Sequence, residues 1–308
     1  MAVTRFSDLV GCRLPLQQAG MARVAGAELA AAVANAGGLG MIGIGRLPLA
    51  ALAITLDRID ALTDDPVGAT FIVPFLDPDL IGVVAERVRV VEFFYGWPDP
   101  ALVAAAPCVG WQVGSADEAR AAADAGCAYV IAQGVEAGGH VRGRQVLTQV
   151  LDEVRTSVDV PVVAAGGIGT AEAVRAALDG GADAVRVGTR FVAAAESDAH
   201  PTYVEALVAS TGADTVLTEA FNVGWRDAPH RVLASAVARA EATTADPVAQ
   251  MEVAGQGIVP VPRFSTSAPT TTTTGDVAAM ALYAGLAVGD VRRRQPAAEI
   301  VAELTAAL

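Results

Sequence analysis

Lysine is absent from this chain of 308 residues, so all 21 of its basic residues are arginines. A Schiff base formed by a lysine amine is therefore excluded, and lysine aldolase chemistry with it. The phosphate-binding lysine of a P-loop is excluded for the same reason. Any phosphate site must use other groups.

Cysteine and histidine are scarce, with three residues of each type. Cys12, Cys108 and Cys127 are widely spaced and form no CxxC pair. We expect buried, reduced thiols of a cytosolic protein rather than disulfides. The scattered cysteines and histidines also lack the ligand spacing of a metal site, so we expect no metal.

Acidic residues outnumber basic ones, so the net charge is −13. An acidic surface repels nucleic acid and anionic membranes, so neither is an expected partner. No uninterrupted apolar run reaches the length of about 18 residues that suggests a membrane span, and the N-terminus lacks the apolar core of a signal peptide. We expect a soluble, cytoplasmic protein.

Apolar residues make up 53% of the chain, and short apolar runs alternate with alanine-rich segments of helical period. Eight such βα units in succession predict a (β/α)8 TIM barrel. The expected strands are Leu14–Gln18, Leu39–Ile44, Gly68–Val73, Val88–Tyr95, Val109–Val113, Tyr129–Gln133, Val160–Ala165 and Ala184–Val187. The expected helices are Gly26–Ala36, Pro48–Leu62, Pro78–Glu86, Pro100–Ala105, Ser115–Ala125, Gln145–Ser157, Thr170–Gly180 and Pro201–Ser210.

The βα rhythm stops after Ser210. The following segment is rich in proline and threonine and is too long for a plain loop, so we expect a lid or small subdomain over the barrel mouth. Helical patterns return at Asp276–Val288 and Pro296–Leu308. The predicted organisation is a barrel core over residues 1–212, a C-terminal lid or subdomain over 213–275, and C-terminal helices over 276–308 that pack on the barrel.

A glycine-rich segment follows the sixth expected strand. Residues 132–143 hold four glycines, and His140 stands among them. Residues just past a strand's C-terminal end line the active-site face of a barrel, and glycines let the backbone approach a flat cofactor. We therefore predict that His140 is functional, although a lone histidine is more often structural.

Glycines also follow the last two expected strands. Backbone N–H groups at such strand ends, each leading into a helix, form the usual phosphate site of a barrel. Tight turns alone would explain each pair singly, but two consecutive units favour phosphate binding. The predicted phosphate ligands are Gly166, Gly167, Gly188 and Thr189.

The chain resembles the nitronate monooxygenase family, which also includes enoyl-acyl carrier protein reductases and NADH:quinone reductases that depend on flavin mononucleotide (FMN). The most specific matching segment is Gln133-Gly-Val-Glu-Ala-Gly-Gly-His140. Further matches are Gln18-Ala-Gly-Met21, Ala164-Ala-Gly-Gly-Ile168 and Gly188-Thr-Arg-Phe191. Weaker matches continue to Tyr283-Ala-Gly285, so the resemblance spans nearly the whole chain.

This resemblance implies an FMN cofactor and roles for individual residues. Ala19 and Met21 would lie along the isoalloxazine ring, and Gln133 would reach its polar edge. Gly138 and Gly139 would pass close by. His140 matches the histidine that removes the α-proton of neutral nitroalkanes in family members that accept them.

Three departures from the family pattern bear on the substrate. The chain has Ala19-Gly20-Met21 where Ala-Pro-Met is usual, and a flavin-contacting asparagine is replaced within residues 71–76. Glu92 replaces a small residue, and Gln112 follows Trp111 on the fifth strand. Glu92 either lines the mouth as an acid–base group or pairs with a buried arginine such as Arg186. We place Glu92, Gln112 and Trp225 in the expected substrate pocket.

Three functions follow from these features. The first is a monooxygenase that takes a small-molecule nitronate or nitroalkane and O2, with His140 as base. The second is an NAD(P)H-dependent reductase of quinones or enoyl thioesters, with a basic spot in the lid formed by Arg226, Arg231 or Arg263. The third is a flavin-binding barrel without catalysis. The sequence leaves the oligomeric state open.

Overall fold

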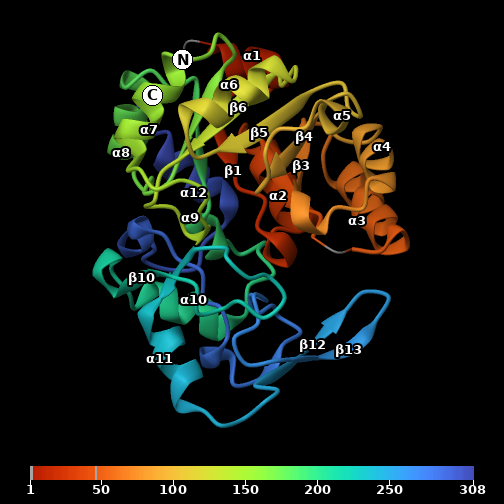
Figure 1. Cartoon of the computed structure of the whole chain (residues 1–308), viewed down its shortest axis with the longest axis vertical. Helices are drawn as coiled ribbons and strands as arrows, with labels where there is room; N and C mark the ends of the chain where they lie inside the picture. Colours follow the sequence, from red (N-terminus) through yellow and green to blue (C-terminus); the bar gives the residue numbers. More distant parts are fainter. Residues whose placement is uncertain (1–2, 46) are drawn as a thin grey trace.

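Eight parallel strands form a nearly closed barrel in the computed structural model, which describes residues 3–45 and 47–308 (Figure 1). A bridge between Gln17 and Leu39 joins the first strand to the second and completes the ring. The predicted TIM barrel is confirmed. The strands are β1 (Leu16–Gln18), β2 (Gly40–Gly43), β3 (Val67–Ile72), β4 (Val90–Phe94), β5 (Val109–Val113), β6 (Tyr129–Gln133), β8 (Val162–Ala165) and β9 (Ala184–Val187).

Helices alternate with these strands because their apolar stripes cover the outside of the sheet. Side-chain caps set several starts: the Ser115 oxygen accepts from the Glu118 N–H, and the Thr170 oxygen accepts from the Ala173 N–H. The helices of the ring are α2 (Ala27–Asn35), α3 (Leu49–Leu62), α4 (Asp79–Ala85), α5 (Pro100–Val103), α6 (Ala116–Asp124), α7 (Leu147–Arg155) and α8 (Ala171–Asp179).

The helix that completes the ring differs from the expected one. The helix predicted at residues 201–210 forms as α10 (Pro201–Val208), but its apolar side chains belong to a second core outside the barrel. The C-terminal helix α12 (Ala297–Leu304) instead packs against α2 and α8 and contributes to the barrel core. The outer ring of helices is therefore completed by α12 and not by α10.

The prediction of a helix at Asp276–Val288 was wrong. This segment holds only the 3-10 turns η4 (Val277–Ala279) and η5 (Leu286–Asp290), with extended chain between them. Residues 279–282 are all buried in succession, a pattern that a one-faced helix cannot satisfy. Tyr283 pairs with Val232 of the second unit, which stabilises the extended form.

The second unit has its own hydrophobic core and lies below the barrel in Figure 1. Its core takes side chains from residues 192–291, together with Val24, and thus begins before the expected boundary at 212. Its elements are β10 (Thr215–Thr218), β11 (His230–Leu233), α11 (Ala234–Ala242), β12 (Ala249–Val253), β13 (Gly257–Val261) and β14 (Thr274–Gly275). The short strand β7 (Gly139–His140), from the loop after β6, pairs with β11 and ties the two units together.

Three further findings concern the cysteines, the helices and possible metal sites. All three cysteines are buried and free. None of the helices in the described ranges combines the length and hydrophobicity needed to cross a bilayer. Those ranges also hold no cluster of three or more His, Cys, Asp or Glu side chains placed to bind a metal ion.

Candidate active site

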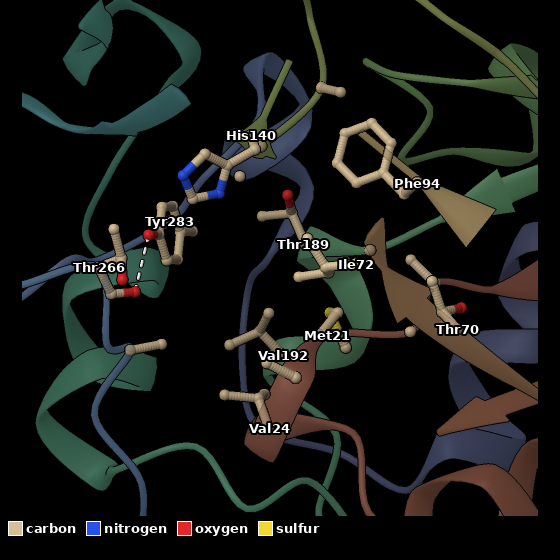
Figure 2. Close-up of a pocket in the computed structure, with 18 of the residues that line it drawn as sticks. Met21, Val24, Thr70, Ile72, Phe94, His140, Thr189, Val192, Thr266 and Tyr283 are labelled. Carbon is tan, nitrogen blue, oxygen red and sulfur yellow. Dashed lines mark hydrogen bonds between the residues drawn. The ribbon is translucent and has the colours of Figure 1, made fainter. Parts of the chain in front are cut away.

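A cavity of about 440 Å³ opens at the C-terminal ends of the barrel strands and is covered by the second unit (Figure 2). Of the thirteen residues predicted for the site, it brings together all but Glu92. Those that line the cavity are Ala19, Met21, Gln112, Gln133, Gly138, Gly139, His140, Gly166, Gly167, Gly188, Thr189 and Trp225.

The loop that carries His140 is held by side chains of its own motif. The Gln133 amide donates to the His140 carbonyl (2.9 Å) and accepts from the Arg142 N–H (3.2 Å). The Glu136 carboxylate accepts from the Leu147 N–H at the start of α7, at 2.9 and 3.0 Å. A carboxylate at this end also complements the helix dipole. Gln133 and Glu136 therefore fix the loop between β6 and α7.

Two glycines of this loop are required by the backbone. A Cβ atom on Gly138 would lie 2.5 Å from the backbone nitrogen of Gly285, which is too close for any side chain. Gly139 has φ +78°, the left-handed region that favours glycine. The backbone of the loop thus passes directly against residues 284–285 and leaves His140 at the cavity wall.

The His140 imidazole is packed among aromatic rings. It stacks on Trp225, with ring centroids 3.9 Å apart and an angle of 23° between planes. The rings of His230 and Tyr283 lie 5.1 and 5.6 Å away, and Figure 2 shows His140 near Tyr283. Within the described residues, its Nε2 atom has no hydrogen-bond partner. Burial, and secondarily the nearby His230, lower the pKa of His140 to about 3. His140 is therefore neutral at physiological pH.

His230 differs from His140 although it also lies in this cluster. Its Nδ1 atom is 2.9 Å from the Ala228 carbonyl, and its Nε2 accepts from the Phe221 N–H at 3.2 Å. Both ring nitrogens are thus satisfied by backbone, which fixes the neutral tautomer protonated on Nδ1. His230 therefore has a structural role. Of these two histidines, His140 is the one that keeps a ring nitrogen without a hydrogen bond.

Glycines at the ends of β8 and β9 form a side-chain-free part of the cavity. Gly166 and Gly167 have φ +118° and +68°, and a Cβ atom on either would lie 3.0–3.1 Å from the loop after β6. Gly188 precedes the short helix α9 (Thr189–Val192), and its bare Cα faces Ala19 and the Met21 sulfur. The Thr189 hydroxyl accepts from the Gly285 N–H at 3.0 Å. Adjacent barrel strands therefore present backbone to one space.

Glu92 does not line the cavity; it lies fully buried inside the barrel. It forms an ion pair with Arg186, which is the structural alternative considered from the sequence. The carboxylate also accepts from the side chains of Gln17 and Tyr129, both at 2.7 Å, and of Thr70 at 3.1 Å. With four donors around it, Glu92 is a structural anion, and its placement in the substrate pocket was wrong.

Arg186 connects this buried pair to the cavity. Besides Glu92, its guanidinium donates to Gln17 at 2.8 Å and to Gln112 at 2.7 Å. Arg186, Gln112 and Thr70 all line the cavity above Glu92. Thr70 and Arg186 were not predicted at the site, although both stand near the C-terminal ends of barrel strands, where cavity residues are expected.

The three lid arginines considered for nucleotide binding lie outside the cavity lining. Arg231 donates to the Val135 carbonyl at 3.0 Å and to the Thr215 hydroxyl at 3.3 Å, and so joins the loop to the second unit. Arg263 donates to the Thr243 carbonyl at 3.0 Å. Neither these two nor Arg226 supplies a basic group to the cavity.

Comparison with known proteins finds relatives of this chain among curated enzymes and solved structures. A curated dehydrogenase of an octahydroindene-carboxyl-CoA from Mycobacterium tuberculosis is 37% identical over 75% of this chain and 66% of its own length. The nitronate monooxygenase of Pseudomonas aeruginosa is 34% identical over 70% of this chain and 76% of its own. The structure of FabK from Thermotoga maritima superimposes with a TM-score of 0.82 at 32% identity, covering 99% of this chain and 95% of that one.

The match to the first of these relatives is partial, since the chain spans slightly less than two thirds of that protein's length. The nitronate monooxygenase family model, in contrast, matches residues 3–81 and 77–307, which is almost the whole chain. The chain belongs to the nitronate monooxygenase family.

Proposed function

We propose that the chain is an FMN-dependent nitronate monooxygenase that acts in the cytoplasm on a small nitronate or nitroalkane with O2. One observation carries the proposal. A half-buried, neutral imidazole with a buried and unbonded Nε2, that of His140, stands in the same cavity as the glycines at the ends of β8 and β9.

The residues present fit FMN. The glycine-lined space beside Gly166, Gly167, Gly188 and Thr189 follows the seventh and eighth barrel strands, where barrels commonly bind phosphate. These glycines present backbone without side chains at this wall of the cavity, and bare N–H groups at such strand ends favour a bound anion. Ala19 and Met21 lie next to Gly188 and would flank the ring system. When bound, FMN supplies the electron-transfer chemistry with O2.

His140 would accept the α-proton of a neutral nitroalkane on Nε2. The C–H bond breaks, its electron pair passes to the nitro group, and the proton ends on the imidazole. Burial keeps the imidazole in the base form but makes it a weak base. Negative charge that develops on a nitro group beside it would raise its proton affinity, which helps the transfer. The Trp225 ring stacked on His140 would limit the access of water to this step.

Anaerobic reduction tests the proposal. The purified protein is first heated, and the released flavin is identified by mass; we expect about one FMN per chain. Holoprotein is then mixed without oxygen with 1-nitropropane, its nitronate, NADH and NADPH in separate trials. Bleaching of the flavin absorbance by the nitro compounds supports the proposal. Bleaching by NADH or NADPH alone would favour the reductase, and recovery of FAD or no flavin would refute the cofactor assignment.

A second candidate rests on the M. tuberculosis relative, whose name describes dehydrogenation of a CoA thioester that carries a hydroxyl group. In this reading the same cavity binds an alcohol whose hydroxyl proton passes to the His140 imidazole, and FMN, when bound, would supply the acceptor for the hydride that leaves the carbon. The same anaerobic experiment decides between them. A hydroxylated acyl-CoA that bleaches the flavin where nitro compounds do not would favour the dehydrogenase.

A further inference from the structure

The cavity extends beyond the glycine-lined space into a second region, here called the outer compartment. In Figure 2, Val24 and Val192 lie on the side of the cavity away from His140 and Phe94. The outer compartment is lined by Arg23, Val24, Val192 and Met251; Arg23 contacts Met251, and Val24, Val192 and Met251 belong to one hydrophobic core. Three of these side chains are apolar and one is a cation, so this end of the cavity suits a ligand with an apolar body and an anionic group.

Arg23 has no acidic partner. Its Nη1 atom faces the Met251 sulfur at 3.4 Å, and a thioether is only a weak acceptor. Throughout residues 3–45 and 47–308, no carboxylate lies within ion-pair distance of this guanidinium. Burial lowers the pKa of Arg23, and no nearby acid opposes that effect. A half-buried cation without a protein anion is stabilised when a ligand supplies the negative charge.

Among the residues that the structure describes, the second cation in the cavity lining is Arg186, which is already neutralised by its pair with Glu92. Within that part of the chain, a substrate anion would therefore meet an uncompensated positive charge at Arg23. Arginine also presents a planar fork of N–H donors that matches the two oxygens of a carboxylate.

The backbone around Arg23 is held in an unusual conformation. Ala22 has φ +44°, which L-residues with side chains rarely adopt. A Cβ atom on Gly43 would lie 2.3 Å from the Ala22 nitrogen, so the glycine makes this path possible. The Val24 carbonyl accepts from the Asp198 N–H at 3.1 Å. These contacts fix η1 (Ala22–Val24) and aim its arginine at the cavity, and strained backbone of this kind is common at binding sites.

We propose that Arg23 is a substrate-recognition residue that binds the carboxylate of an organic acid, whose apolar chain lies along Val24 and Val192. This inference rests on the proposed function, since it names the substrate class of the same cavity. The acid group lies in the outer compartment while the reacting carbon lies by His140.

Calorimetric titration with hexanoate and with the uncharged isostere hexanamide tests the inference on the purified holoprotein. The native protein should bind hexanoate at least tenfold more tightly than hexanamide, because a hydrogen bond to a charged group contributes a factor of about ten to a hundred. Arg23→Met keeps an unbranched side chain against Met251 and removes the charge. It should lose the preference while its Kd for hexanamide stays unchanged.

Two further variants sharpen the test. Arg23→Lys keeps the charge and should retain at least part of the preference for hexanoate. Arg263→Met removes a lid arginine outside the cavity and should leave both dissociation constants unchanged. Equal affinity of the native protein for the two compounds, no binding of either, or an undiminished preference in Arg23→Met would overturn the inference. Loss of hexanamide binding in Arg23→Met would also overturn it, because Arg23 would then only hold the structure.

The titration measures binding without turnover, so it separates this inference from the proposed function. A protein that turns over nitro compounds but shows no preference for hexanoate would refute only the role of Arg23. A protein that prefers hexanoate through Arg23 but never turns over nitro compounds would refute only the monooxygenase.

Discussion

Replacing Arg186 should lower the free energy of unfolding more than replacing a surface arginine does. In Arg186→Met, Glu92 would remain buried without its cation, and Gln17 and Gln112 would each lose a donor. Breaking a buried ion pair from one side typically costs about 3–5 kcal/mol, because the remaining charge cannot be solvated. We therefore expect the free energy of unfolding in urea at pH 7 to fall by about 3–5 kcal/mol.

Two controls accompany this measurement. Arg175→Met removes an exposed ion pair with Asp179 and should change the free energy of unfolding by no more than about 0.5 kcal/mol. Adding Glu92→Gln to Arg186→Met removes both buried charges and keeps an oxygen that can accept from Tyr129. The double variant should recover to within about 2 kcal/mol of the native protein. A loss in Arg186→Met no larger than that in Arg175→Met would refute the reasoning.

Three other perturbations have defined outcomes. Gly167→Asp or Gly188→Asp should abolish FMN retention while the barrel still folds, because each adds a side chain and a negative charge next to the backbone at which we place the phosphate; normal flavin content by absorbance, with native circular dichroism, would show that the phosphate lies elsewhere. The kcat/KM for a neutral nitroalkane should stay flat from pH 8 down to pH 5, since the base form of His140 is lost only as pH falls through its pKa of about 3; a decline near pH 6.5 that disappears in His140→Gln would contradict this. Burial raises the pKa of Cys12 to about 11 and of Cys127 to about 12, so a chromogenic disulfide at pH 8 should react with these thiols only after denaturation, and rapid titration of the native protein would contradict their burial.

Local sequence was sufficient to predict the strands of the barrel. Strands such as β6 and β8 are apolar on both faces because helices cover one face and the barrel interior the other, and this produces short continuous apolar runs. The glycines after β8 and β9 were also recognisable, since chain position alone puts them at the active-site face.

Features that depend on partners distant in the chain were harder to predict. The helices at residues 201–208 and 297–304 have similar apolar stripes, and only tertiary packing decides which one completes the ring. Glu92 and Arg186 are 94 residues apart, so the sequence could offer their pairing only as an alternative. Arg23 belongs to no motif, and its role as an unneutralised cation appears only once Met251 and the cavity are placed beside it.

The central claim is that His140 is the base for neutral nitroalkanes, and His140→Ala tests it most directly. Steady-state rates of native and variant enzyme are compared on a nitroalkane and on its preformed nitronate, with flavin content measured in both. The account predicts a loss of about two to four orders of magnitude on the nitroalkane, the range expected for a positioned general base. The variant should keep much of its activity on the nitronate, which has already lost the proton, and all of its flavin. Equal losses on the two substrates would contradict the account, because His140 would then orient substrate or flavin rather than accept the proton.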